Sequence, residues 1–499
     1  MNLPENIRAA RRAGVPLLAI DTDDPASASR EVIAALNGKA QELAIAQWDI
    51  LRGLVAMSPP AQDAIRVLCD GQDPALATGN PAECLSLLAR WPERGLVMMH
   101  GAGRLLSDDQ GGAAVVQGIW NLRDVWKSTG TTLVLLSPGI QLPPELKQDV
   151  VVLTEELPTA EALGDIVIQL SEDSGIAVPD DTADKAVDTV LGLSAFAAEQ
   201  SLAMSLTKDG LDLPSLWDRK CQAIEQTPGL SVWRGGETFA DIGGCENAKT
   251  FLRSVLAGRQ PPRAVVFIDE IEKSLAGAGG DTSGVSQSLL GTLLTYMQDK
   301  GTTGSILIGP PGAAKSAIAK ATGNEAGVPT IALDFSGLKA SLVGQSEQRL
   351  RSALRAIDAI AQGQALFLAT CNSIGTLPPE LRRRFTFGTF FFDLPNAEER
   401  QAIWNIYRTK FDLPEDDGLP EDRGWTGAEI KQCADLAWRL QVPLKKAAMY
   451  VVPVATSAAK QIEALRRDAS GKYLSAATSG VYRYDQTAGV PTKRAMDLN

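Results

Sequence analysis

The chain has 499 residues, a formal net charge of −12 and a sequence pI near 4.9. At about 150 residues per domain, this length predicts roughly three domain-sized units, and the acidic balance argues against a dedicated nucleic-acid or membrane-surface binder. Six scattered cysteines without C-x-x-C spacing, and a single histidine, argue against a zinc site or a disulfide framework. No apolar run approaches the roughly 18 residues of a membrane span, and residues 1–12 lack a signal-peptide core, so a cytoplasmic protein is predicted.

Residues 1–208 alternate predicted strands with predicted helices. The strands fall at 15–21, 42–48, 95–100 and 132–137, and the helices at 28–36 and 118–128. This alternation favours a mostly parallel sheet covered by helices. No glycine-rich phosphate loop follows any of these strands. Helical stretches at 166–174 and 187–206 are interpreted as a small lid that completes this first module.

An internal repeat links the two halves of the chain. Leu142–Leu146 and Leu377–Leu381 both read L-P-P-E-L, and each lies between two apolar strands that precede an L-P-x-A-E sequence. Matching order at nearly equal offsets indicates two related modules. In the first module His100 ends a strand where a metal-binding acid would be expected. The first module is therefore predicted to be unable to hydrolyse nucleotide, and a structural role for His100 is favoured over a switch.

Residues 209–235 are interpreted as the connection to a second module. That module contains Ala264–Ile268, an apolar strand followed by the paired acids Asp269 and Glu270. Asp269 is predicted to hold Mg²⁺ through water, and Glu270 to orient and activate an attacking water. The alternative is a buried strand that simply ends in a charged turn.

The strand at 305–308 leads into Gly309–Ser316, which nearly fits the phosphate-loop pattern G-x-x-x-x-G-K-[ST]. Backbone N–H groups and the following helix would face the phosphates, Lys315 would reach the β- and γ-phosphates, and Ser316 would ligate Mg²⁺. Ala314 replaces the second glycine and is expected to be tolerated only at negative φ. The predicted phosphate-binding residues are Gly309, Pro310, Pro311, Gly312, Ala313, Ala314, Lys315, Ser316 and Ala317. A strand-turn-helix with a chance lysine is the alternative.

The order of these two motifs is unusual, because in P-loop ATPases the acid-bearing strand follows the phosphate loop. Here one strand-helix unit is predicted to be transposed ahead of it. The chemistry requires only that Asp269 and Ser316 meet at the carboxyl edge of one sheet, and short connections permit that topology.

Polar residues after the last strands complete the predicted site. Asn372 follows the strand at 366–370 and would lie beside the γ-phosphate and the water. The run Arg382–Arg384 follows a short helix and is either a solvated helix end or an arginine finger directed at a neighbouring subunit. Helices at 397–407, 427–440 and 444–450 are predicted to form a second small lid. A helix and then a loosely ordered tail from residue 470 are predicted to follow.

Together these motifs resemble an AAA+ ATPase of the AAA clade proper. Further matches are Phe239–Gly244 and Gly424–Glu429. The resemblance implies that Asp241, Ile242, Gly243, Gly427 and Ala428 take part in nucleotide binding. It also implies that Arg384 is one finger arginine and that Arg383 or Arg382 is the other. Over about residues 10–470 the chain is similar to an uncharacterised plastid and cyanobacterial AAA+ family.

The resemblance predicts an α/β fold of tandem AAA+ modules, each with a RecA-like parallel sheet and a helical lid. The predicted ranges are a degenerate module (1–208), a linker (209–235), an ATPase core (236–395), a lid (396–456) and a C-terminal helix with tail (457–499). The expected function is an ATP hydrolase that uses ATP and Mg²⁺, forms a ring of six subunits and remodels a protein partner. An ATP-dependent scaffold or switch with slow hydrolysis is the alternative. Ser341–Gly344, where the clade usually carries an aromatic pore-loop residue, weakens the case for threading a polypeptide, and a nucleic-acid motor is disfavoured by the acidic charge.

Overall fold

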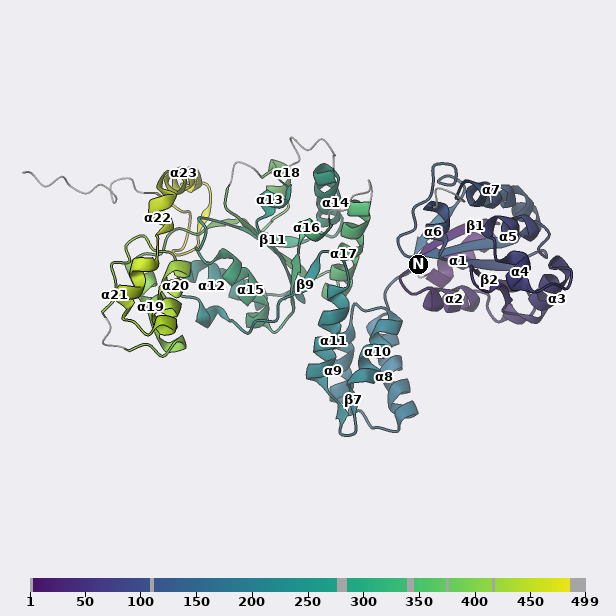
Figure 1. The fold of residues 1–499 in the computed structure, drawn as a ribbon, viewed down its shortest axis with the longest axis horizontal. Coiled ribbons are helices and arrows are strands. Elements are labelled where there is room, and N and C mark those ends of the chain that lie inside the picture. The colour runs from purple at the N-terminus through teal and green to yellow at the C-terminus, as the bar shows by residue number, and fades with distance from the viewer. Residues whose placement is uncertain are drawn as a thin grey trace, which may run out of the picture. The chain divides into compact units, whose positions relative to one another are not determined.

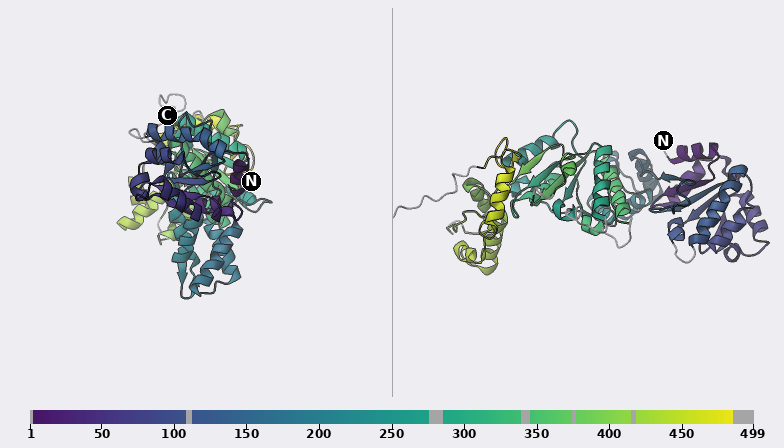
Figure 2. Two further views of the ribbon diagram at one scale, coloured as in Figure 1. Left: turned by 90° about the vertical axis from the view of Figure 1, so that its right-hand side faces the viewer. Right: turned by 90° about the horizontal axis from the view of Figure 1, so that it is seen from above.

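The computed structural model describes residues 3–107, 112–275, 285–338, 345–373, 377–414 and 418–484. The chain divides into two compact units, Met1–Trp217 and Asp218–Asn499 (Figures 1 and 2). The division falls inside helix α11 (Leu213–Glu225). Residues 209–235, where the sequence predicts a connection, therefore contain a helix and also strand β9 (Leu230–Val232).

The first unit alternates strands and helices. Its strands are β1 (Leu17–Asp21), β2 (Ile45–Asp49), β3 (Gly53–Ala56), β4 (Leu96–His100), β5 (Thr132–Ser137), β6 (Val151–Thr154), β7 (Leu206–Thr207) and β8 (Gly210–Leu211). Its helices are α1 (Leu3–Arg12), α2 (Pro25–Ala34), α3 (Pro59–Leu68), α4 (Pro74–Thr78), α5 (Pro81–Leu88), α6 (Ala102–Ser107), α7 (Gly112–Thr129), α8 (Ala160–Ser174), α9 (Asp180–Val190) and α10 (Ala195–Ser205), with a short 3₁₀ turn, η1 (Lys39–Gln41).

The first six strands form one sheet in the order β3-β2-β4-β5-β1-β6, parallel except for the β2-β3 hairpin. One face carries a core with Trp48 and Trp126, and the other packs against α1 and α2 through residues such as Ile7 and Val32. The buried indole N–H groups donate to main-chain carbonyls, Trp48 Nε1 to Thr78 at 2.6 Å. Helices cover both faces because a parallel sheet buries both.

The second unit repeats this plan. Its further strands are β10 (Ala264–Ile268), β11 (Thr303–Ile308), β12 (Thr330–Leu333), β13 (Ala365–Cys371), β14 (Thr389–Phe391) and β15 (Leu474–Ser475). Its helices are η2 (Phe239–Asp241), α12 (Glu246–Leu256), α13 (Ile271–Leu275), α14 (Val285–Asp299), α15 (Lys315–Ala326), α16 (Phe335–Leu338), α17 (Gln345–Ala361), α18 (Pro379–Arg382), α19 (Ala397–Lys410), α20 (Gly427–Leu440), α21 (Leu444–Ala447), η4 (Ala448–Tyr450), α22 (Val454–Ser457) and α23 (Ala459–Ala469).

The second sheet has the order β15-β14-β11-β13-β10-β12-β9, in which only β9 runs antiparallel to its neighbour. All residues of the central strand β10 are buried. The five strands β14-β11-β13-β10-β12 correspond in order to β6-β1-β5-β4-β2 of the first unit. The predicted fold class, two α/β modules with parallel sheets, is therefore confirmed.

Corresponding strands do not occur in the same chain order in the two units. β4 follows β1 and β2 along the chain, whereas its counterpart β10 precedes both β11 and β12. β10 nevertheless pairs with β12 on one side and with β13 on the other, in the same position in the sheet as β4 in the first unit. Its carboxyl end thus meets the same sheet edge as the carboxyl ends of β11 and β13.

The helices after β14 form a small bundle with its own apolar core around Trp404, Trp425 and Ile430. Helix α20 begins with a capping box, in which Thr426 and Glu429 each accept a hydrogen bond from the other's main-chain N–H. Beyond α23 the chain returns to the sheet as β15, which pairs with β14. The predicted loosely ordered tail is therefore wrong for residues 470–484; the remainder of that prediction lies outside the described residues.

Candidate functional site

The predicted phosphate loop connects β11 to α15 and requires close backbone packing. A Cβ atom at Gly309 would lie 2.1 Å from the Phe392 carbonyl oxygen. Gly312 has φ 79°, and a Cβ there would lie 2.7 Å from Thr426 Oγ1. Glycine is thus the residue that fits both positions, and the loop lies against the start of α20.

Ala314 departs from the sequence-based expectation. It was expected to be tolerated only at negative φ, but it precedes α15 in the left-handed region with φ 64° and ψ 7°. Ala314 adopts this conformation as the N-cap residue of α15. An alanine in that region costs about 1–2 kcal/mol, so the loop carries backbone strain that glycine would not have.

Lys315 is the first residue of α15 and its side chain is buried, with 5% of the residue exposed. Its Nζ donates to the main-chain oxygens of Gly309 at 2.8 Å and Pro310 at 2.7 Å. Burial lowers the pKa of this ammonium from 10.5 to about 8, partly opposed by the nearby carboxylates of Glu272 and Asp269. The phosphate loop therefore holds a poorly solvated cation among its own carbonyl groups.

Asp269 and Ser316 come together from different elements, as the sequence predicts. Ser316 Oγ donates to Asp269 Oδ1 at 2.9 Å, and Thr370 Oγ1 donates to the same oxygen at 2.5 Å. Asp269 follows β10, Ser316 lies on α15, and Thr370 lies on β13. The hydroxyl-carboxylate pair is thus built where three elements meet at one sheet edge.

Glu270 and Asn372 form a second contact at this edge. Asn372 Nδ2 donates to Glu270 Oε1 at 3.0 Å, and Lys273 pairs with the Glu270 carboxylate at 2.8 Å. Glu270 has φ 46°, and its N–H donates to Thr370 Oγ1 at 2.9 Å. The Glu270 side chain remains 41% exposed. A carboxylate held in this way is oriented and still accessible to solvent.

Glu272 is a residue that the sequence analysis did not identify. It is only 6% exposed, and its Oε1 accepts from the main-chain N–H of Asn372 at 2.9 Å. Its Oε2 is buried without a hydrogen-bond partner among the described residues. Among the nearby carboxylates, Glu272 has the largest effect on Lys315. Its charge raises the pKa of Lys315 and so opposes the effect of burial. The sequence signal was available, since Glu272 lies two positions after Glu270.

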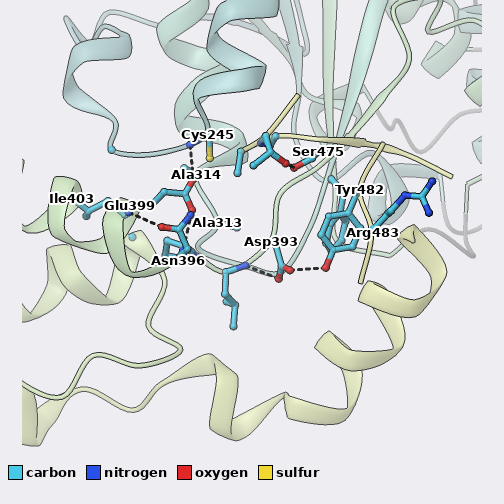
Figure 3. A pocket seen from close by; sticks show the side chains of 18 of the residues that line it. Cys245, Ala313, Ala314, Asp393, Asn396, Glu399, Ile403, Ser475, Tyr482 and Arg483 are labelled. Atoms are coloured by element: carbon cyan, nitrogen blue, oxygen red, sulfur yellow. Dashed lines mark hydrogen bonds between the residues drawn. The ribbon is translucent and has the colours of Figure 1, made fainter. Parts of the chain in front are cut away.

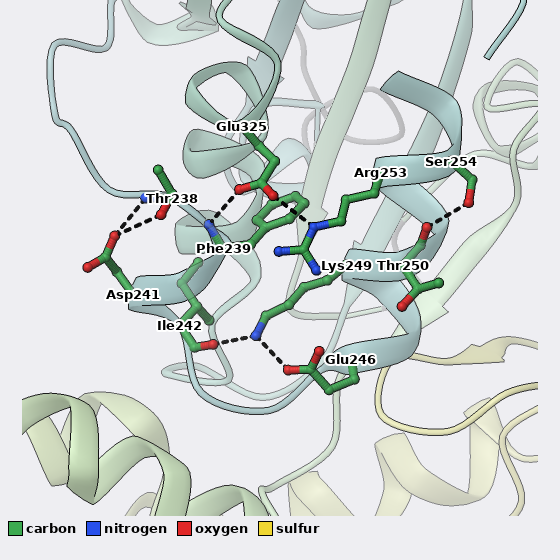
Figure 4. A network of polar contacts seen from close by, with 10 residues as sticks. All are labelled: Thr238, Phe239, Asp241, Ile242, Glu246, Lys249, Thr250, Arg253, Ser254 and Glu325. Carbon is green, nitrogen blue, oxygen red and sulfur yellow. Dashed lines mark hydrogen bonds and ion pairs between the residues drawn. The ribbon is translucent and has the colours of Figure 1, made fainter. Parts of the chain in front are cut away.

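The residues before α12 have different environments (Figure 4). The Asp241 carboxylate accepts from Thr238 N at 2.8 Å and so closes a capping box, while the Ile242 carbonyl accepts from the buried Lys249 ammonium. Gly243 packs against the lid, where a Cβ would lie 2.6 Å from Ile403 Cγ1. Of these three predicted nucleotide-binding residues, only Gly243 lines the cavity described next.

A cavity of about 340 Å³ opens beside the phosphate loop (Figure 3). It is lined by Ala313 and Ala314 of the loop, by Gly243, and by Gly427 at the start of α20. Ala428 also lies close to the loop, since a Cβ on Gly312 would be 3.2 Å from its methyl group. Volumes of this size are typical of sites for small organic ligands. Of the predicted loop and lid residues, Ala313, Ala314 and Gly427 line this cavity, whereas Lys315 and Ser316 do not.

The arginine run Arg382–Arg384 begins at the last residue of α18. Arg384 Nη2 donates to Gln298 Oε1 of α14 at 2.6 Å, and Arg383 is exposed. Neither arginine lines the cavity beside the phosphate loop. The predicted segment Ser341–Gly344 lies outside the described residues.

The first unit has different chemistry at the corresponding edge. β1, the counterpart of β11, ends at Asp21, and the chain continues as Thr22-Asp23-Asp24, which offers carboxylates instead of a glycine-rich loop. β4, the counterpart of β10, ends at His100, whose Nε2 is buried without a hydrogen-bond partner among the described residues and whose pKa is lowered by burial. The first unit therefore carries carboxylates where the second unit carries its predicted phosphate loop.

Comparison with known proteins supports the fold. Residues 3–155 match the model of the SpoVK-like AAA ATPase N-terminal domain. Residues 305–362, from β11 into the end of α17, match the model of the ATPase family associated with various cellular activities, AAA. The second match begins after Asp269 and Glu270. The chain therefore carries AAA ATPase domains.

Among individual proteins, the chain is homologous to the uncharacterized AAA domain-containing proteins named ycf46. It is 22% identical to that of Guillardia theta over 458 residues, which cover 82% of this chain and 80% of the relative. The ycf46 of Pyropia yezoensis is 21% identical over 456 residues, covering 82% and 83%. A cell division cycle protein 48 homolog of Archaeoglobus fulgidus is 27% identical over 173 residues, covering 26% and 24%. Among the described residues, no helix has the length and apolar character to cross a membrane.

Proposed function

We propose that the second unit binds Mg-ATP at the phosphate loop and hydrolyses it. The observation that carries this proposal is the contact of Ser316 Oγ with Asp269 Oδ1 at 2.9 Å. These residues come from α15 and from the end of β10, which are far apart in the chain and out of the usual order. A phosphate-loop hydroxyl beside a strand-end carboxylate is the arrangement that P-loop ATPases use for the metal of their nucleotide.

The donor chemistry suits Mg²⁺. Both partners supply oxygen, which Mg²⁺ prefers, and this ion usually takes only one or two carboxylates, completing its shell with phosphate oxygens and water. Consistent with that mode, the described residues contain no cluster of three or more His, Cys, Asp or Glu side chains that could hold a metal alone. When bound, the ion would neutralise charge on the phosphates.

The side chains have separate roles in the proposed reaction. Lys315, with a pKa of about 8, carries its charge at neutral pH and can exchange its bonds to loop carbonyls for phosphate oxygens. Glu270 accepts a proton from the attacking water, and the Asn372 amide holds that carboxylate and orients the water. Glu272 holds the main chain of Asn372 and so positions the amide.

We further propose that the protein acts as a ring of six subunits that remodels a protein partner. AAA proteins commonly assemble as rings, and Arg383 is exposed at the end of α18, which suits delivery to a neighbour's γ-phosphate. An ATP-dependent scaffold or switch with slow hydrolysis is the second candidate. Ala314 favours it, because this residue departs from the second glycine of the phosphate-loop pattern.

Two variants of the full chain test the site. Lys315→Ala should abolish ATP binding, because the lysine contacts phosphate in the ground state. Glu270→Gln should retain ATP binding and lose turnover, since its carboxylate acts only on the water. Calorimetric titration with ATP and a phosphate-release assay give the two readouts, with Glu398→Gln, an exposed lid residue, as the control. If Glu270→Gln loses ATP affinity as Lys315→Ala does, the assignment of Asp269 and Glu270 is wrong.

A further inference from the structure

The cavity beside the phosphate loop has a wall that comes from the end of the described chain. Residues Leu474–Arg483, which we call the C-terminal arm, contribute Ser475, Ala476, Ala477, Thr478, Val481, Tyr482 and Arg483 to its lining. Figure 3 shows Ser475, Tyr482 and Arg483 on the other side of the cavity from Asn396, Glu399 and Ile403 of the lid. The arm therefore faces the lid across the cavity.

Main-chain bonds fix the arm to the core of the second unit. Ala476 N–H donates to the Phe391 carbonyl at 3.0 Å and extends the pairing of β15 with β14. The Ala476 carbonyl in turn accepts from Ala248 N–H at 3.0 Å, and Asn247 Nδ2 donates to the Ser475 carbonyl at 2.6 Å. Ala248 and Asn247 belong to the first turn of α12. The arm thus joins the sheet to the helix that follows Gly243.

Side chains hold the far end of the arm. The Tyr482 ring lies 4.4 Å from the Phe391 ring, and its Oη donates to Asp393 Oδ2 at 2.6 Å. Arg466 of α23 pairs with the other oxygen of Asp393 at 2.7 Å. Tyr482 is 9% exposed and the side chains of Arg466 and Asp393 are 25% and 26% exposed, so this anchor is partly shielded from water, where such bonds contribute more. The arm is therefore a fixed wall and not a surface strand end.

The position of the cavity indicates which part of a nucleotide it would bind. It begins at Ala313 and Ala314, so a triphosphate held by the loop would direct its nucleoside into it. The arm presents small side chains there, Ala476 and Ala477, followed by the Thr478 hydroxyl. Small residues leave room for a flat heterocycle, and Ile403 on the lid offers an apolar surface opposite.

We propose that the C-terminal arm contacts the nucleoside part of the bound nucleotide, with Ala477 and Thr478 as positioning residues. This inference rests on the proposed nucleotide site and adds to it a wall from the far end of the chain. Binding of the nucleoside should then stabilise the arm, while binding of phosphate groups alone should not.

The test separates nucleoside contacts from phosphate contacts by using two probes, ATP and inorganic tripolyphosphate. In Ala477→Trp the indole fills the cavity, so the affinity for ATP should fall at least about tenfold, a loss of roughly 1.4 kcal/mol, with tripolyphosphate affinity unchanged. Ser479→Trp, exposed on the same turn and outside the lining, is the matched control and should bind ATP as the wild type does. Unchanged ATP affinity in Ala477→Trp would overturn the inference.

A measurement on the wild type tests the same inference without requiring that Ala477→Trp folds. Amide hydrogen exchange at Ala476 and Tyr482, whose N–H groups donate to Phe391 and Tyr473, should slow with ATP and not with tripolyphosphate. Equal exchange with and without ATP would overturn the inference. Failure of Lys315→Ala to weaken either probe would instead reject the proposed nucleotide site itself, so the two failures are distinguishable.

Discussion

Replacing Ala314 with glycine should stabilise the protein. Ala314 lies in the left-handed region at φ 64°, where an alanine costs about 1–2 kcal/mol and a glycine almost nothing. Glycine also gives the unfolded chain more conformational freedom, which lowers the free energy of unfolding by about 0.4–1 kcal/mol and so offsets part of the strain that is relieved. The net increase in the free energy of unfolding should be about 0.5–1 kcal/mol. For a unit of this size that raises the melting temperature by roughly 2 °C.

The neighbouring alanine supplies the control. Ala313 is 5% exposed, packs in the apolar core and is outside the left-handed region. Ala313→Gly removes a buried methyl and adds unfolded-state freedom, so its free energy of unfolding should fall by about 1 kcal/mol. Chemical denaturation of the full chain at one pH, followed by a signal from the second unit, measures both variants. If Ala314→Gly is destabilised as much as Ala313→Gly, the strain attributed to Ala314 does not exist.

Three further predictions concern other parts of the chain. Since burial lowers the Lys315 pKa to about 8, the folded state binds fewer protons than the unfolded state between pH 8 and 10.5, and this group should add stability as the pH rises through that window. Lys315→Met has no group that titrates there, so its free energy of unfolding should exceed that of the wild type by on the order of 3 kcal/mol at pH 7, and this difference should shrink toward pH 10.5. If chemical denaturation gives the same pH dependence of the free energy of unfolding for both proteins, the lowered pKa is contradicted. The same variant should show no thermal stabilisation by millimolar Mg-ATP, because the first unit lacks a phosphate loop, and a clear shift would reveal a site there. Arg384→Ala should bind ATP normally but hydrolyse it at least about 10²-fold more slowly, and mixing it with Lys315→Ala should restore part of the activity if the arginine acts on a neighbour. Wild-type turnover per subunit that does not depend on protein concentration, with no recovery on mixing, would speak against a ring.

The features predicted from sequence are those with a local signal. The strand Ala264–Ile268 is a continuous apolar run, and the acids that follow it must lie at the edge of a parallel sheet. The same reasoning placed Asn372 after β13 and Ser316 at the start of α15. β13 and β10 are neighbours in the sheet, so the residues that follow them lie close together, whatever the order of the two strands in the chain. The hydrogen bond from Asn372 Nδ2 to Glu270 Oε1 is such a contact.

The features that sequence reasoning missed depend on distant contacts. β15 has two residues, too few for any periodicity, and it is held by bonds such as that of Asn247 to the Ser475 carbonyl. The composition of the segment, rich in serine, glycine and alanine, indicates a flexible tail when read alone. The φ of Ala314 was missed for another reason. The second glycine position of the phosphate-loop pattern has a left-handed conformation, and the alanine that replaces the glycine adopts the same conformation at a cost in energy.

The place of β10 in the chain has a consequence for synthesis on the ribosome. Its parallel neighbours, β12 and β13, lie downstream, so the fully buried residues Ala264–Ile268 leave the exit tunnel about a hundred residues before β13 is complete. At about 5–20 residues per second the strand spends roughly 5–20 s without both partners. An apolar strand with an unpaired edge is prone to association with other chains. The nascent second unit should therefore need protection by a chaperone for longer than the first, whose central strand β4 follows its neighbour β2.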